Sequence, residues 1–162
     1  MPARNRLRNE NLEYLSRYLE PLGFHTFLAP PSIRRTYFEY IIRYDSAKIP
    51  LRLDWLIDAL VQEGCRISRP RYPLLHQQPF FTEGHYREVA RSRHDIVLPD
   101  YSTVELPNTE RMSTTLVKLP SFPNASRDLL DQYIAAFEKV LTHAAEIATR
   151  YEAVSAHCEE SR

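Results

Sequence analysis

The side chains best suited to bind a ligand are concentrated in one stretch, RPRYPLLHQQPFFTEG, at positions 69–84. Arg71 can hold an anion through two parallel hydrogen bonds, and Tyr72 and His76 can hydrogen-bond hydroxyl groups. The prolines stiffen the backbone that carries them, and such irregular segments often line binding sites. An ordinary polar surface loop has the same composition, and on composition alone it is the better interpretation.

Other kinds of chemistry have little support in the sequence. Only Lys48, Lys118 and Lys139 could serve a lysine-based reaction, and three glycines leave no phosphate loop or dinucleotide fingerprint. No group of His, Asp or Glu has the spacing of a zinc site, so no metal is expected. The two cysteines, Cys65 and Cys158, lie far apart and predict reduced cytosolic thiols.

Length and charge narrow the class of protein. The chain has 162 residues, 43% of them apolar, with 21 basic and 21 acidic side chains. This composition predicts one folded domain with a sizeable core. A net charge of zero argues against a nucleic-acid binder or a membrane-surface protein, and no apolar run could span a bilayer or act as a signal peptide. We therefore expect a cytoplasmic protein.

Hydrophobic periodicity predicts the elements that must position these side chains. In 36–44, alternation puts Phe38, Tyr40 and Ile42 on one face of a strand. Three-to-four-residue spacing predicts the main helices, and Gly64 and Ser126 are expected to cap two of them. The expected elements are helices at 5–22, 53–64, 108–115 and 126–148, and strands at 36–44, 65–69 and 116–119.

These elements predict an α/β (α+β) fold in which helices cover a small, three-stranded, largely antiparallel sheet. We expect residues 1–153 to form a single domain and residues 154–162 to form a frayed tail. Arg4, Arg6 and Arg8 stand at the start of the first helix, where the helix dipole disfavours cations.

The order of several segments resembles a known family. These segments are NRLRNENLEYLSRYLE, TYFEYIIRYD, VQEGCRI, YPLLHQQPFFTEG and LPNTERMSTTLVKLPSF, within about Asn5 to Ile147. Together they resemble the C-terminal domain of the DegT/DnrJ/StrS sugar aminotransferases. His76, Gln78 and Pro79 fall as in the family's HxQP run. The branch closest in pattern aminates keto-inositols in aminoglycoside synthesis and is typified by glutamine:scyllo-inosose aminotransferase.

The resemblance implies a role in transamination that this chain cannot perform alone. Family members hold pyridoxal phosphate on a lysine of a large domain that precedes the small one. Here that lysine, the aspartate partner of the cofactor and the phosphate loop are missing, so this chain alone is expected to bind no cofactor. The three early arginines would then lie inside a longer helix, with Met1 marking a cut. Phe38 also departs from the pattern, because many members have His there.

Two functions follow as expectations. The first is the substrate-closing half of an aminotransferase for a keto-sugar or keto-cyclitol, with glutamine or glutamate as donor, in aminoglycoside or amino-sugar biosynthesis. Arg71, Tyr72 and His76 would bind substrate, and the partner would be a large-domain chain or a second copy. The alternative is a non-catalytic binding or regulatory module that associates with a partner enzyme.

Overall fold

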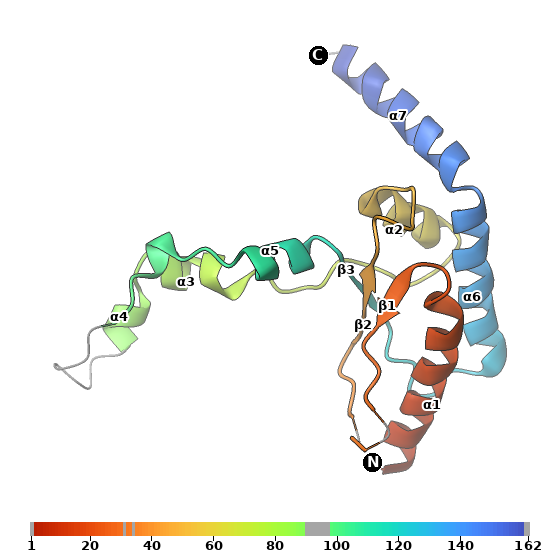
Figure 1. The fold of residues 1–162 in the computed structure, drawn as a ribbon, viewed down its shortest axis with the longest axis horizontal. Helices are drawn as coiled ribbons and strands as arrows, with labels where there is room; N and C mark the ends of the chain where they lie inside the picture. The colour runs from red at the N-terminus through yellow and green to blue at the C-terminus, as the bar shows by residue number, and fades with distance from the viewer. Residues whose placement is uncertain (1, 31, 34, 90–97, 161–162) are drawn as a thin grey trace. The chain divides into compact units, whose positions relative to one another are not determined.

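The computed structural model describes residues 2–30, 32–33, 35–89 and 98–160, with only the backbone for 155–160. It divides into two compact units: a core unit formed by Met1–Arg69 with Thr115–Arg162, and an insertion unit formed by Pro70–Thr114. Figure 1 shows the elements of both units. The core unit contains α1 (Pro2–Leu19), β1 (Phe24–Thr26), β2 (Tyr40–Tyr44), α2 (Leu53–Gln62), β3 (Leu116–Leu119), α6 (Arg127–Thr142) and α7 (Ala144–Glu160).

A three-stranded antiparallel sheet lies at the centre of the core unit, in the order β1-β2-β3. The pairing of β1 with β2 begins with Phe24 opposite Tyr44. The pairing of β2 with β3 begins with Tyr40 opposite Leu119. Tyr40, Ile42 and Tyr44 are buried, and α1 and α6 lie on one side of the strands (Figure 1). The predicted fold class is therefore confirmed.

The helices join the sheet through a continuous apolar core. Leu12 and Leu15 of α1, Leu56 of α2, and Leu130 and Phe137 of α6 are at most 1% exposed. Polar contacts add to this packing: the Asn11 side chain donates to the Phe122 carbonyl at 2.9 Å, and the Tyr14 hydroxyl donates to Asp131 at 2.6 Å. These contacts fix α1 against α6 and the segment before it.

Both predicted helix caps are present. The Ser126 hydroxyl accepts the Leu129 N–H and begins α6. Gly64 follows α2 with φ +89°, the left-handed geometry expected of a C-terminal glycine. Gly23 is similar at φ +99° and also sits against Ile49, where an added Cβ would come within 3.0 Å of a side-chain carbon. The turn from α1 into β1 therefore requires glycine.

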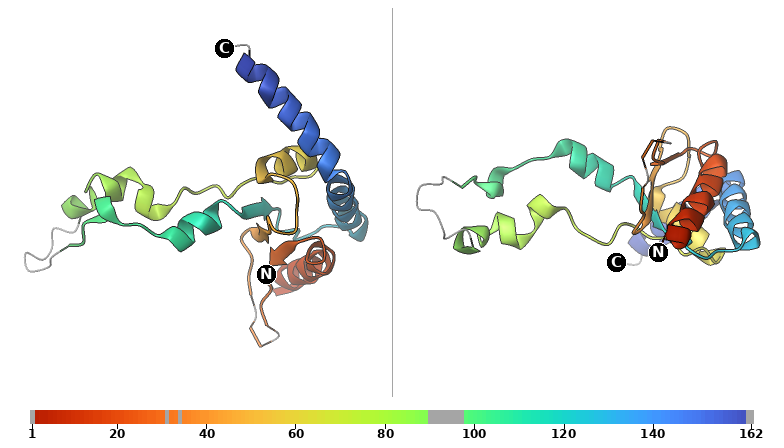
Figure 2. Two further views of the ribbon diagram at one scale, coloured as in Figure 1. Left: turned by 45° about the horizontal axis from the view of Figure 1, so that its top comes forward. Right: turned by 90° about the horizontal axis from the view of Figure 1, so that it is seen from below.

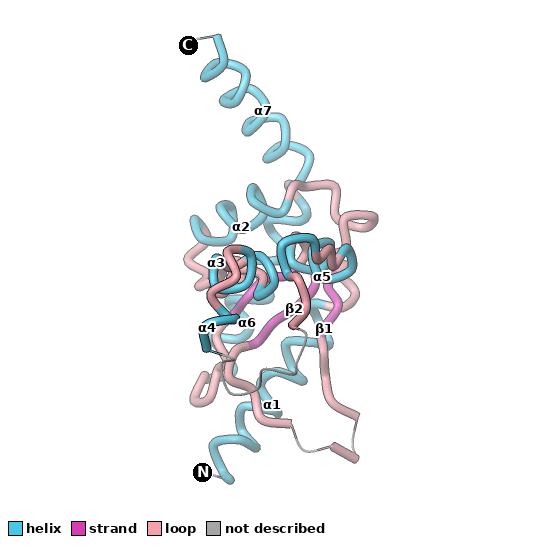
Figure 3. The backbone as a smooth tube through the Cα atoms, turned by 90° about the vertical axis from the view of Figure 1, so that its left-hand side faces the viewer, coloured by secondary structure: helices cyan, strands magenta, loops and turns pink. Residues whose placement is uncertain are grey.

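Two strand predictions were wrong in extent. β2 begins at Tyr40, and Phe38 before it is 81% exposed. The ladder stops at Leu119 because Pro120 has no N–H to donate. The predicted strand 65–69 is reduced to one bridge, Ser68↔Lys118, and ends at Pro70. The third strand is instead β1, which is only three residues long. Figure 3 shows the long connection between β1 and β2.

The predicted C-terminal helix is two helices. α6 ends at Thr142, whose hydroxyl donates to the Glu138 carbonyl, and α7 begins at Ala144 after the cap residue His143. Figures 1 and 2 show a change of axis direction at this junction. The backbone is helical to Glu160, and this range includes residues 154–160 of the expected tail. No glycine or proline interrupts that stretch.

The insertion unit is built from short helical turns. They are η1 (Leu75–Gln77), α3 (Pro79–Thr82), α4 (Tyr86–Val89), η2 (Tyr101–Thr103) and α5 (Pro107–Ser113). α5 matches the short helix predicted at 108–115. Figure 3 labels three of them, α3, α4 and α5, in cyan.

Candidate functional site

The three predicted ligand-binding side chains lie in the first part of the insertion unit. Tyr72 is 68% exposed, and the Arg71 guanidinium lies 5.9 Å from the centre of its ring. This is a weak cation–π contact that leaves both polar ends open to solvent. Arg71 and Tyr72 are therefore adjacent and accessible.

His76 has a different environment. It lies in η1 and is buried, with 8% of its surface exposed. Its Nε2 is 3.1 Å from Oε1 of Glu110, in the first turn of α5. The same carboxylate oxygen accepts the Leu106 N–H at 3.2 Å and so caps the start of α5. Glu110 thus joins the loop that carries His76 to the helix 34 residues further along.

The carboxylate of this pair is stabilised in its charged form. The hydrogen bond from His76, followed by that from the Leu106 backbone, lowers the pKa of Glu110 below its ordinary value. Since an ionised carboxylate can only accept, Nε2 of His76 must carry a proton and donate it. Nδ1 is then the ring atom left for a ligand. His76 is held in one orientation, while Arg71 and Tyr72 are not.

The rest of the insertion unit gathers around a group of aromatic rings. Phe81 lies 6.2 Å from Tyr86 and 5.1 Å from Tyr101, and Tyr86 and Tyr101 are 4.9 Å apart, edge to face. Phe80 packs on Phe81 at 5.0 Å. Phe80 and Phe81, near the end of the stretch that carries the predicted ligand-binding side chains, therefore belong to this aromatic cluster, which comprises Phe80, Phe81, Tyr86 and Tyr101.

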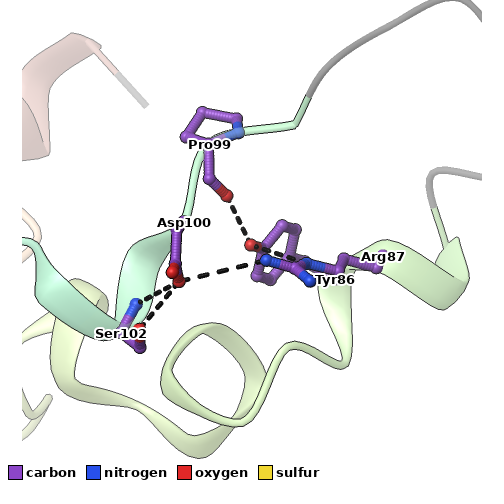
Figure 4. Close-up of polar contacts among 5 residues, drawn as sticks. All are labelled: Tyr86, Arg87, Pro99, Asp100 and Ser102. Carbon is purple, nitrogen blue, oxygen red and sulfur yellow. Dashed lines mark hydrogen bonds and ion pairs between the residues drawn. The ribbon is translucent and has the colours of Figure 1, made fainter.

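Polar contacts close the cluster (Figure 4). The Tyr86 hydroxyl donates to the Pro99 carbonyl and accepts from Arg87 Nε at 3.1 Å. The Arg87 guanidinium also lies 3.9 Å from Asp100. Asp100 accepts from the backbone and hydroxyl of Ser102, at 3.0 and 2.8 Å. These bonds to Ser102 lower the pKa of Asp100. The contacts of Tyr86 with Pro99 and of Arg87 with Asp100 tie α4 to the start of η2.

The lysines of this chain do not form a site for pyridoxal phosphate. Lys118 Nζ is 3.5 Å from Glu39, and Lys139 Nζ is 2.8 Å from both oxygens of Glu63. Lys48 is exposed in the connector after β2. Gly23, Gly64 and Gly84 each occupy a separate turn, so they form no phosphate cradle. The residues present therefore do not fit the cofactor.

The remaining candidates for chemistry are a buried thiol and the side chains that could bind a metal. Burial raises the pKa of Cys65 to about 11, so its thiol stays protonated at neutral pH. Within the described ranges no three His, Cys, Asp or Glu side chains are grouped to hold a metal ion. In the same ranges no helix is both long and apolar enough to cross a membrane.

Comparison with known proteins points to one group of enzymes. No family model matches this sequence. A DegT DnrJ EryC1 StrS aminotransferase from Brucella abortus has a similar structure, with a TM-score of 0.60 and 20% identity over 85% of this chain. Spr1654 from Streptococcus pneumoniae, solved in a PMP form, has a TM-score of 0.60 and 17% sequence identity over 90% of this chain. The aminotransferase TlmJ from Streptoalloteichus hindustanus has a TM-score of 0.57 and 21% sequence identity over 88% of this chain.

The shared part is a minor portion of those enzymes. The matches cover 31%, 32% and 32% of the three solved chains. At 17–21% identity they establish the fold, which is that of one part of sugar-aminotransferase-type structures. This chain spans about a third of their length.

The His76–Glu110 pair should respond to acid. The native pKa of Glu110 is lowered, so its stabilising contribution is complete above the ordinary pKa of a glutamate and is lost as pH falls through the lowered native value. We expect the Leu106 amide to lose hydrogen-exchange protection, and the His76 ring signals to shift, over that acidic window. NMR between pH 6 and strongly acidic pH would measure both. Glu110→Gln should remove the transition, and a transition retained in that variant would assign it to another carboxylate.

Proposed function

We propose that this chain is the substrate-closing half of a pyridoxal phosphate-dependent aminotransferase. It would act on a keto-sugar or keto-cyclitol, with glutamine or glutamate as amino donor, in aminoglycoside or amino-sugar biosynthesis. Within that family we propose the branch that aminates keto-inositols. The observation that carries the proposal is a match over 85–90% of this chain to only 31–32% of each aminotransferase.

In this proposal the rest of the enzyme supplies the cofactor. The complete enzyme would hold pyridoxal phosphate on a large domain, from a partner chain or a longer protein, because no lysine of this chain is suitably placed. That group would supply the amino-transfer chemistry. Residues 1–153 would form one aminotransferase C-terminal domain, with Pro70–Thr114 as its substrate-facing insertion, and the enzyme would work in the cytoplasm.

The insertion unit would contribute substrate contacts. Tyr72 is exposed and its hydroxyl can both donate to and accept from a sugar hydroxyl. Arg71 beside it can pair with an anionic group of the substrate or donor. His76, oriented by Glu110, would present Nδ1 to a hydroxyl. A ring fixed before substrate arrives loses little entropy on binding, which favours a defined substrate pose.

A second candidate is a non-catalytic binding module that associates with a partner enzyme. The observation favouring it is the state of the lysines: Lys118 and Lys139 are ion-paired, and neither neighbours a phosphate-binding loop. The two candidates differ in whether a cofactor-bearing partner restores turnover.

Reconstitution tests the proposal. The chain mixed with pyridoxal phosphate, glutamine and a keto-cyclitol should form no 2-oxo acid above background. The DNA upstream of the Met1 codon should encode, in frame or as a neighbouring gene, a segment with the cofactor lysine. Co-expression of that segment should produce 2-oxo acid and aminated cyclitol. Turnover by the chain alone that disappears on mutation of Lys48, Lys118 or Lys139 would refute the division of labour, and an inactive mixture would favour the binding module.

The same reconstituted enzyme tests the site residues. Tyr72→Phe and His76→Ala should each lower kcat/KM several-fold, because each removes a hydrogen bond to a substrate hydroxyl worth on the order of 1 kcal/mol. Tyr72→Phe should leave the melting temperature unchanged. If His76→Ala lowers the melting temperature and Tyr72→Phe leaves kcat/KM intact, these side chains are structural.

A further inference from the structure

The face of the sheet opposite the buried side chains carries two cations, Arg43 and Lys118. Because side chains alternate along a strand, the buried Tyr40, Ile42 and Tyr44 leave Ile41 and Arg43 on the opposite face. The strand register places neighbours beside them: His25 and Leu116 both pair with Arg43. Lys118 pairs with Ile41 in the next outward-facing row. These five residues form the outer-face set.

Arg43 has no counter-charge in this set. Lys118 is paired with Glu39 at 3.5 Å, and both of these side chains are only 21% exposed. Arg43 is also partly buried, and in the part of the chain that the structure describes it makes no side-chain hydrogen bond or ion pair. One cation of the outer face is neutralised and the other is not.

This arrangement favours an anion as ligand. Ile41 and Leu116 are partly buried apolar neighbours, so they keep some water away from the guanidinium and strengthen its attraction for an opposite charge. A guanidinium matches the two oxygens of a carboxylate in a planar, bidentate pair. His25 pairs directly with Arg43 across the two strands, and side chains of directly opposed residues are neighbours, so its ring can offer a second hydrogen bond to the same group.

We propose that Arg43, assisted by His25, binds a carboxylate of a small dicarboxylic acid on the outer face of the sheet. A glutamate donor and its 2-oxo product carry such a carboxylate three carbons from the reacting centre. Only this identification of the acid rests on the proposed function. Arg71 is the competing cation, but it is exposed and turned to the Tyr72 ring.

Glutarate provides a probe that has no amino or keto group and so cannot react. The arginine Nε–Hε signals of the full chain are followed by NMR during titration with glutarate, and neutral glutaramide serves as the control compound. The Arg43 signal should shift with saturation in the millimolar range, because the guanidinium is partly buried and the His25 ring adds a second hydrogen bond. Glutaramide should leave it unmoved.

Variants separate Arg43 from the other arginines. Arg43→Gln should weaken glutarate binding at least about tenfold, and Arg43→Lys should retain part of it because the charge remains without the planar fork. Arg17→Gln, at an exposed position of α1, is the matched control and should bind as the parent does. Melting curves of all variants check that the sheet is intact.

Three outcomes would overturn the proposal: unchanged binding in Arg43→Gln, loss of binding in Arg71→Gln, or equal unsaturable shifts at every exposed arginine. Absence of glutarate binding to the parent chain would also overturn it, and a carboxylate supplied by a partner protein would give that result. The result is independent of turnover, because glutarate binding needs no cofactor. An inactive reconstituted enzyme would leave the binding result standing, and absent binding would leave turnover unaffected.

Discussion

Phe137→Ala should remove a large part of the stability of the core unit, about 3–5 kcal/mol. The Phe137 ring on α6 is fully buried and meets the Phe24 ring of β1 edge to face, with centroids 5.2 Å apart. Truncation would remove the buried surface and leave a cavity between helix and sheet. A domain of this kind has a total stability of roughly 5–15 kcal/mol. Denaturant unfolding followed by circular dichroism would measure the change.

The same helix offers a matched control. Leu129 is also apolar and lies on α6, but it is 40% exposed. Leu129→Ala changes helix propensity little and should cost no more than about 0.5 kcal/mol. Equal losses for the two variants would mean that α6 does not pack on the sheet through Phe137.

Local sequence signals predicted the parts of the fold that depend on neighbouring residues. The alternation around Tyr40 and Ile42 gave β2, and Ser126 and Gly64 marked helix ends with side-chain and backbone chemistry that acts within one turn. Other features depend on distant partners. β1 is too short to show a period, and it forms because Phe24 and Thr26 find β2 some 16–20 residues away. The expected strand 65–69 had the right composition but only Ser68 reached a partner.

The candidate site also contains residues with a local sequence signal and contacts that depend on distant partners. The sequence identified the stretch that carries Arg71, Tyr72 and His76, because polar and aromatic side chains between prolines are visible locally. It missed Glu110. The only local signal there was a carboxylate in the first turn of a helix opened by Pro107, and its contact with His76 spans 34 residues. The contact between the rings of Tyr86 and Tyr101 could not be predicted from hydrophobic periodicity either, because the two residues are far apart in the sequence.

Burial changes what His76 can do in the proposed enzyme. A fully exposed histidine would be free to follow a substrate hydroxyl, whereas His76 has one ring nitrogen committed to Glu110. Its effect on substrate would therefore depend on α5, which Glu110 caps. Tyr72, in the same unit, has no such constraint. Substrate contacts from the insertion unit would thus combine one fixed side chain, His76, with one that can adjust, Tyr72.

Tyr86→Ala should unfold the insertion unit and leave the core unit folded. Tyr86 is 8% exposed, and it is one of two residues of that unit, with His76, that are buried among the described residues. Its ring contacts Phe81 and Tyr101, and its hydroxyl holds the Pro99 carbonyl (Figure 4). Removing a buried aromatic ring costs about 3 kcal/mol or more, and a unit with so small a core has little other apolar burial to offset the loss.

Hydrogen exchange would localise the effect of Tyr86→Ala. Amides of α5 and η1 should lose protection while those of α6 and β2 keep it, because the core unit has its own apolar cluster, to which Tyr86 does not belong. Tyr86→Phe keeps the ring and loses only the hydrogen bonds of the hydroxyl, so its effect should be nearer 1 kcal/mol. Tyr72→Ala, at a position 68% exposed, should change neither unit. Protection that survives in α5 of Tyr86→Ala would show that the His76–Glu110 pair, and not the aromatic cluster, holds the insertion unit together.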